Sequence, residues 1–171
     1  MNFLKIAAPA VLLILALIRV NPAYTGERLN AESLNSKGMH ELEAGNNRAA
    51  AEYFLQAIKS DPSKKNYYNN LAAAYIRIRD YSRAEQHLSM AITLDPNYAK
   101  ALANMSVVMF RTGRYKKAYE YYKRAEQSDP AYTGERFGKK RVLSRLKEEA
   151  KSNPDDHSLK IMIKQIESSG E

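Results

Sequence analysis

The sequence repeats itself with a period of 34 residues, and this period limits the folds open to the chain. Three Asp-Pro pairs lie one period apart, at residues 61–62, 95–96 and 129–130. Two sets of alanines follow the same period, and they are Ala50, Ala84 and Ala118, then Ala57, Ala91 and Ala125. A period of this length is typical of repeat proteins whose units are pairs of helices. The sequence therefore predicts three similar units that stack on one another.

Within the second unit, apolar residues recur at the spacing of an α-helix. They form two stripes on either side of Arg79-Asp80, and are Leu71, Ala74, Tyr75 and Ile78, then Ala84, Leu88, Ala91 and Ile92. This spacing predicts two antiparallel helices joined by a tight turn. The residue before a proline avoids helical angles, so each Asp-Pro pair is expected to end a unit. We therefore expect an all-α solenoid of helix pairs.

These residues resemble the tetratricopeptide repeat family over about residues 31–132. The family has a small residue eight places into each unit, which here is Gly38, Ala72 or Ser106. The apolar residue before it is present as Leu71 and Met105 and is replaced in the first unit by Lys37. The aromatic residue three places after it is present as Tyr75, loosened in the third unit to Met109 and replaced in the first by Glu41. The resemblance implies a right-handed solenoid of three repeats, at 31–64, 65–98 and 99–132, of which the first is the most degenerate.

The C-terminal part, residues 133–171, is expected to close the stack. Residues 133–151 predict one basic capping helix with an apolar stripe at Val142, Leu143, Leu146 and Ala150. Its basic patch comprises Lys139, Lys140, Arg141 and Arg145. A solvated capping face accounts for this charge, and contact with an anionic surface is the alternative. A turn at residues 153–156 then leads into a short second helix.

The N-terminal segment, residues 1–21, is apolar. Residues 6–18 carry no charge, and the stretch extends to residues 3–20 if the charges of Lys5 and Arg19 reach outward to the membrane surface. Thirteen residues suit the core of a signal peptide, whereas eighteen reach the lower limit of a spanning helix. We expect an apolar N-terminal helix that anchors the chain in the membrane through residues 3–20, with a cleaved signal or a buried core helix as alternatives. We therefore expect a single-pass protein whose bulk lies outside the cytoplasm, in the periplasm. Residues 22–30 are expected to form a linker.

One heptapeptide, PAYTGER, occurs twice, at residues 22–28 and 130–136. The two copies lie 108 residues apart, which is six more than three periods. A duplicated linker between repeats explains them, and docking of both copies into equivalent grooves is the alternative.

The sequence carries no recognisable reaction chemistry. There is no Cys, and the three His residues are too far apart to pair as ligands on one helix. Glycine-rich phosphate loops, nucleophile elbows and paired carboxylates are missing too. We expect neither an enzyme nor a cofactor or metal site. The net charge of +8 indicates either attraction to an anionic surface or a solvated helical surface rich in lysine and arginine. We do not expect nucleic acid, because Phe137 is the single aromatic residue among the basic residues of the C-terminal part.

The resemblance implies that the first helix of each pair lines a concave groove that suits a peptide. The expected groove residues are Asn35, Met39, Leu42, Asn66, Asn69, Asn70, Ala73, Arg77, Lys100, Ala103, Asn104, Val107, Phe110 and Arg111. Side-chain amides can bond a peptide backbone, and the basic residues favour acidic ligands. Some family members clamp a carboxylate with five residues, of which only Asn70 and Lys100 are present here. We therefore do not expect such a clamp.

The leading hypothesis is a membrane-tethered scaffold that binds a partner polypeptide in the groove. A homo-oligomer assembled through the repeat ends, and binding of an anionic surface through the basic patch, are the two alternatives.

Overall fold

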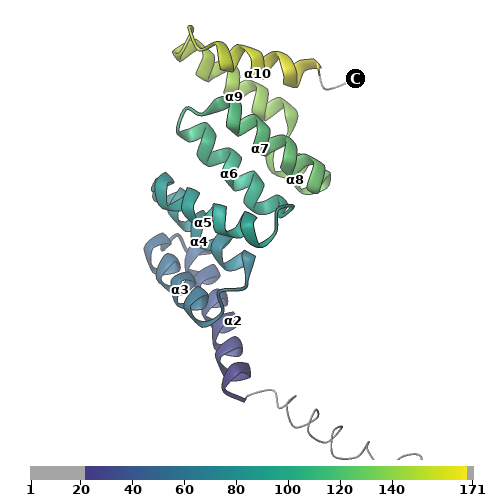
Figure 1. Cartoon of the computed structure of the whole chain (residues 1–171). Helices are drawn as coiled ribbons and strands as arrows, with labels where there is room; N and C mark the ends of the chain where they lie inside the picture. The colour runs from purple at the N-terminus through teal and green to yellow at the C-terminus, as the bar shows by residue number, and fades with distance from the viewer. Residues whose placement is uncertain (1–21, 169–171) are drawn as a thin grey trace, which may run out of the picture.

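The computed structural model of the chain describes residues 22–168, with side chains from residue 30 onward (Figure 1). Residues 22–168 form nine helices and no strand, so the all-α prediction is confirmed. The helices are α2 (Pro22–Glu43), α3 (Asn47–Ser60), α4 (Lys65–Arg77), α5 (Tyr81–Leu94), α6 (Ala99–Arg111), α7 (Tyr115–Ser128), α8 (Pro130–Phe137), α9 (Lys139–Ser152) and α10 (His157–Ser168).

The membrane segment predicted at residues 1–21 lies outside the described residues. None of the helices from α2 to α10 is both long enough and apolar enough to cross a bilayer.

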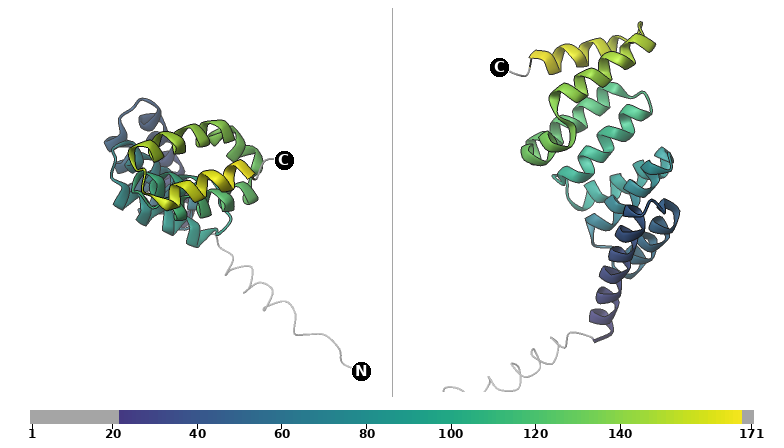
Figure 2. Two further views of the ribbon diagram at one scale, coloured as in Figure 1. Left: turned by 90° about the horizontal axis from the view of Figure 1, so that it is seen from above. Right: turned by 180° about the vertical axis from the view of Figure 1, so that it is seen from behind.

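Consecutive helices pair as α2–α3, α4–α5 and α6–α7, and the pairs stack along the molecule (Figures 1 and 2). The helices α2, α4, α6 and α8 contact one another in succession. Within residues 22–168, by contrast, α3, α5 and α7 do not contact one another. The first helices of the pairs are therefore closer together and lie on the inner side of the curve, which we call the inner face.

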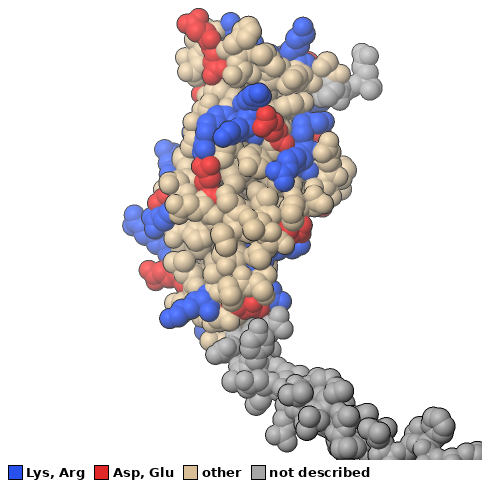
Figure 3. All heavy atoms as spheres, viewed as in Figure 1, with Lys and Arg blue, Asp and Glu red and all other residues tan. Residues whose placement is uncertain are grey.

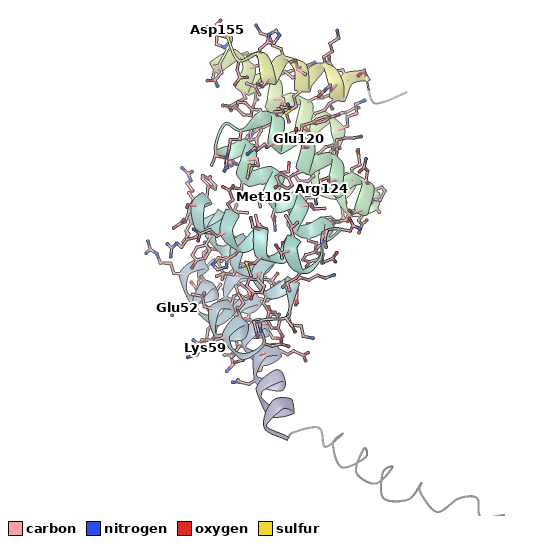
Figure 4. The ribbon with its side chains drawn as sticks, in the orientation of Figure 1. Glu52, Lys59, Met105, Glu120, Arg124 and Asp155 are labelled. Atoms are coloured by element: carbon pink, nitrogen blue, oxygen red, sulfur yellow. The ribbon has the colours of Figure 1, made fainter. Side chains whose placement is uncertain are left out.

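The repeated alanines occupy the places where the helices cross. All six of them are at most 1% exposed, so a larger side chain would force the helices apart. Met105 of α6 lies inside the stack, whereas Glu52 and Lys59 of α3 project from its edge (Figure 4). Asp61, Asp95 and Asp129 each follow the last residue of a helix, in extended conformation, as the Asp-Pro pairs predict.

The turn inside each pair requires a left-handed residue. Gly45, Arg79 and Gly113 lie one period apart and have φ values of 84°, 62° and 74°. Glycine adopts this conformation without a steric penalty, whereas Arg79 brings its Cβ close to the backbone. The second turn is therefore strained relative to the other two.

The N-terminal helix differs from its expected form. Residues 22–30, expected as a linker, continue without interruption into the first helix of the first pair. Both copies of PAYTGER begin a helix at their proline, at Pro22 and Pro130, because a proline suits the first helical turn. Both copies of this heptapeptide are therefore helical, and their interpretation as a duplicated linker stays a prediction.

The predicted capping helix at residues 133–151 is divided in two. Gly138 adopts a φ of 58° between α8 and α9 and interrupts the helix there. The guanidinium of Arg141 then donates hydrogen bonds to the carbonyls of Glu135, Arg136 and Phe137, which satisfies the C-terminal end of α8. The break lets α9 leave the direction of α8, so that the side chains of Tyr115 on α7 and Leu146 on α9 share one apolar core.

Helix α10 lies across the end of the stack, against α9 and α7 (Figure 2). The carboxylate of Asp156 accepts hydrogen bonds from the backbone N–H groups of Ser158 and Leu159, as an N-cap does. A second apolar core forms here from Tyr115, Leu146, Leu159, Met162 and Ile166. The polar outer surface of this hairpin closes the array.

Candidate functional site

A row of side-chain amides runs along the inner face and crosses four helices. The Nδ2 of Asn70 on α4 donates to the Oδ1 of Asn35 on α2 at 2.9 Å. The Nδ2 of Asn104 on α6 donates to the Oδ1 of Asn69 on α4 at 2.8 Å, and Asn69 contacts the Oδ1 of Asn70 at 3.4 Å. Arg136 of α8 continues the row with a 2.5 Å bond from its Nη2 to the Oδ1 of Asn104. We call these five residues the amide row.

Burial divides the amide row into two kinds of residue. Asn69 and Asn104 are only 6% and 5% exposed, so their hydrogen bonds chiefly hold neighbouring repeats in register. Asn35 and Asn70 are half-buried, and each amide has more donor and acceptor sites than the row uses. A bound chain could therefore reach Asn35 and Asn70 more easily than the other two. The role of all four as partner-binding residues stays a prediction.

The remaining predicted groove residues lie on the same helices. Met39, Asn66, Ala73, Val107 and Phe110 are half-buried, whereas Leu42 and Ala103 are buried in the core. Arg77 donates a hydrogen bond to the carbonyl of Leu42, which joins the second pair to the first. Lys100 and Arg111 are exposed and form no hydrogen bond or ion pair with any described residue. Among the predicted groove residues, the cations without a partner in the described part of the chain are therefore both on α6.

A cavity of about 730 Å³ opens at that C-terminal end, between α6, α7, α8, α9 and α10. We call it the terminal pocket. Two predicted groups meet in it, because Phe110 and Arg111 of the groove face Arg141 and Arg145 of the basic patch. Its other lining residues include Val107, Tyr122, Arg136, Phe137, Val142, Leu146, Glu148, Met162 and Ile166.

The other two residues of the predicted basic patch lie elsewhere. Lys139 and Lys140 are exposed at the start of α9 and do not line the terminal pocket. The Nζ of Lys139 approaches the carbonyl of Glu167 at 3.4 Å. In Figure 3, Lys and Arg side chains gather over the C-terminal half of the molecule, with a few acidic side chains among them. The patch is therefore not one continuous basic surface.

Tyr122 contributes a neutral wall to the terminal pocket. Burial, and then a 3.0 Å hydrogen bond from its hydroxyl to Glu126, raises the pKa of Tyr122 to about 12. Its ring meets that of Phe137 edge-on, with centroids 5.7 Å apart. The hydroxyl therefore stays protonated at neutral pH and adds no negative charge.

Arg136, Phe137 and Tyr122 were not predicted as site residues. Asn70 and Asn104 are one period apart, and the next position in that series is Gly138, which cannot continue the row. The available signal was the proline at the start of the second PAYTGER copy, which predicts a helix start and would have placed Arg136 on the next inner helix.

The described residues contain no group of three His, Cys, Asp or Glu side chains that could hold a metal ion. That the chain is not an enzyme stays a prediction.

In one class of helical repeat proteins, stacked helix pairs present their first helices on an extended concave surface. The inner face places this chain in that class. Residues 35–99 and residues 79–136 each match a sequence profile described as tetratricopeptide repeat. Residues 35–136 are therefore tetratricopeptide repeats, and the resemblance noted in the sequence is confirmed. The exact boundaries of the three repeats stay predictions.

Solved structures support the same fold. The Arabidopsis OM64 TPR domain is 20% identical, with a TM-score of 0.61, over 84% of this chain and 98% of that one. MamA is 19% identical, with a TM-score of 0.63, over 93% of this chain and 85% of that one. The second TPR of Spaghetti (RPAP3), bound to an HSP90 peptide, is 25% identical, with a TM-score of 0.61, over 63% of this chain and 99% of that one. No curated protein matches the chain in sequence.

Proposed function

We propose that this chain is a protein-protein interaction scaffold that binds a partner polypeptide along its inner face. The observation that carries the proposal is the amide row, which aligns half-buried amides of α2 and α4 by bonds between neighbouring helices. Amides held in this way are already oriented, so little side-chain entropy is lost when they bond a peptide backbone. No particular peptide sequence is required by such bonds.

The solved structures support the proposal by analogy. The second TPR of Spaghetti (RPAP3) has the same fold and is bound to an HSP90 peptide. This chain lacks three of the five residues of a carboxylate clamp, with Asn35, Met39 and Asn104 in their places. We therefore infer a partner that is held mainly through its backbone and through the cations Lys100 and Arg111, rather than a clamped C-terminus.

We further propose that residues 3–20 tether the scaffold to a membrane, with its bulk outside the cytoplasm. The apolar length of this segment supports the proposal. Because α2 begins at Pro22, such a tether would hold the N-terminal end of the stack at the membrane and leave the terminal pocket at the far end.

Crosslinking in the native cell tests the proposed binding. A photoreactive residue replaces Lys100, which is exposed on the inner helix α6, and a control replaces Lys59, which is exposed on α3. We expect one foreign polypeptide to be captured from position 100 and not from position 59. Its loss when Asn35 and Asn70 are replaced by Ala would assign the contact to the amide row.

Two results would contradict the proposal. Capture of this chain alone from position 100 would indicate a homo-oligomer. Equal capture of many proteins from positions 59 and 100 would show that the inner face has no selective role.

A further inference from the structure

We propose that the terminal pocket binds an acidic polypeptide segment that carries an apolar side chain. This inference rests on the proposed function and names the class of partner. It concerns the terminal pocket between α6 and α10, where the amide row ends at Arg136.

The charge of the pocket is unbalanced. Four arginines line it, Arg111, Arg136, Arg141 and Arg145, and Glu148 is the single acidic residue among the described residues that do so. Arg136 and Arg141 already donate to Asn104 and to the end of α8, so they fix the shape of the pocket. Arg111 and Arg145 form no hydrogen bond or ion pair with any described residue.

Two guanidinium groups without a partner among the described residues thus line one cavity, and a carboxylate there can accept charge-assisted hydrogen bonds from them. Guanidinium groups also match carboxylates in a planar, two-point geometry. The pocket is therefore suited to one or two carboxylates from Asp or Glu side chains.

The floor of the pocket is apolar. Val107, Phe110 and Val142 are half-buried there, above the buried core residues Leu146 and Met162. A cavity of about 730 Å³ has room for a large apolar side chain together with its neighbours. An apolar side chain of the partner gains by leaving water for this floor, which a simple anion cannot do.

The shape and the rings favour a polypeptide over other anions. A lipid surface would need its basic residues on an outward face, whereas these arginines surround a hollow. Single-stranded nucleic acid needs open aromatic faces, but the ring of Phe137 is engaged by Tyr122 at its edge and by the guanidinium of Arg136, 5.6 Å from its centroid. An acidic segment with one apolar side chain uses every feature of the pocket.

Fluorescence anisotropy of the full chain with three labelled heptapeptides tests the proposal. The probes are EEDFEED, its neutral form QQNFQQN and its form without an apolar residue, EEDSEED. We expect EEDFEED to bind at least tenfold more tightly than either of the others, and its affinity to fall with added salt. The double variant Arg111→Glu with Arg145→Glu should lose at least tenfold in affinity for it.

A matched control makes the same charge change away from the pocket. Arg48→Glu with Lys116→Glu alters two exposed residues of α3 and α7 that form no bond with any described residue, and should change the affinity less than twofold. Circular dichroism confirms that both variants keep their helices. The milder Arg111→Gln with Arg145→Gln should show an intermediate loss.

Several outcomes would overturn the inference. These are equal binding of EEDFEED and QQNFQQN, no effect of the Arg111 and Arg145 variants, competition by inorganic phosphate as strong as by the peptide, and tighter binding to phosphatidylglycerol vesicles that depends on the same two arginines. A dimer that these variants abolish would assign the pocket to a second copy of the chain. If crosslinking from position 100 still captures a partner, the proposed function survives such a failure.

Discussion

Lys37 of α2 and Leu71 of α4 occupy the same place in the first and second repeats, yet their surroundings are opposite. Leu71 is fully buried, whereas Lys37 is exposed. The second pair packs on the first through contacts of α3 and α2 with α4, and within residues 22–168 no pair precedes α2. The apolar requirement at this place is therefore set by the preceding neighbour rather than by the helix pair itself.

The small residue of the repeat shows a second difference between the same two pairs. Gly38 lies against the ring of Phe54, and a Cβ added there would come within 2.6 Å of the Cε1 of Phe54. The second repeat has Ala72 and Leu88 at the equivalent places, and both are fully buried. The first pair combines the larger ring of Phe54 with a glycine, whereas the second combines a leucine with an alanine. The sizes of the two residues therefore depend on each other.

The largest expected effect tests the comparison between Lys37 and Leu71. Leu71→Ala removes a fully buried side chain and should lower the free energy of unfolding by about 3 kcal/mol. Lys37→Ala at the equivalent exposed place should change it by less than about 0.5 kcal/mol. Urea unfolding followed by circular dichroism measures both variants. Equal losses would show that Lys37 is covered in solution and that the explanation by neighbours is wrong.

The second prediction concerns the pair Gly38 and Phe54. Gly38→Ala should lower the free energy of unfolding by about 1 kcal/mol, because the clash with Phe54 outweighs the better helix propensity of alanine. Adding Phe54→Leu recreates the combination of Ala72 and Leu88 and should cost less than the sum of the two single changes. A double-mutant cycle by urea unfolding gives this coupling. Additivity within about 0.3 kcal/mol would contradict it.

The third prediction uses the turns of the same two pairs. Arg79→Gly should raise the free energy of unfolding by about 0.5 kcal/mol, since relief of the left-handed strain exceeds the added freedom of the unfolded chain. Gly45→Ala should lower it by about 1 kcal/mol, and only through the backbone, because nothing lies within 4 Å of the added Cβ. Thermal unfolding of the two variants checks the opposite signs.

The fold was predictable from sequence because a 34-residue period encodes contacts that are local. Ala50 and Ala84 meet the helices next to them in the chain, so their spacing alone predicts the pairs. The role of Arg141 was not predictable, because its partners are the backbone carbonyls that end α8, and carbonyls leave no trace in a sequence. For the same reason Arg141 was assigned to a surface patch.

The terminal pocket was not predictable either. Arg111 and Arg145 are 34 residues apart, but α9 is not the first helix of a fourth pair stacked in register. Their meeting depends on the bend at Gly138 and on the packing of α10 against α7. A helix break at a single residue such as Gly138 decides which distant segments come together. It leaves the pattern of apolar residues in the surrounding sequence almost unchanged.

The last and smallest effect sharpens the comparison between junctions of repeats. Arg114 donates two hydrogen bonds to the carboxylate of Glu85, at 2.9 Å and 2.6 Å, and so joins the third pair to the second. The equivalent places at the first junction hold Ala51 and Asp80, which cannot form this pair. This ion pair is therefore present at the second junction and not at the first.

The hydrogen bonds from Arg114 lower the pKa of Glu85, against the opposing effect of burial. A carboxyl group whose pKa is lowered by folding stabilises the protein above its unfolded pKa, and this contribution is lost as the pH falls through the folded pKa. Both side chains are about one third exposed, so the contribution at neutral pH should be only about 0.5 kcal/mol. Glu85→Gln should therefore destabilise the protein slightly at neutral pH, and this loss should shrink as the pH falls below the ordinary pKa of a glutamate. Glu52→Gln, on the exposed edge of α3, is the control and should show no difference at neutral or acidic pH. A Glu85→Gln loss that persisted in acid would assign the contact to hydrogen bonding alone, and the two junctions would then differ in shape rather than in charge.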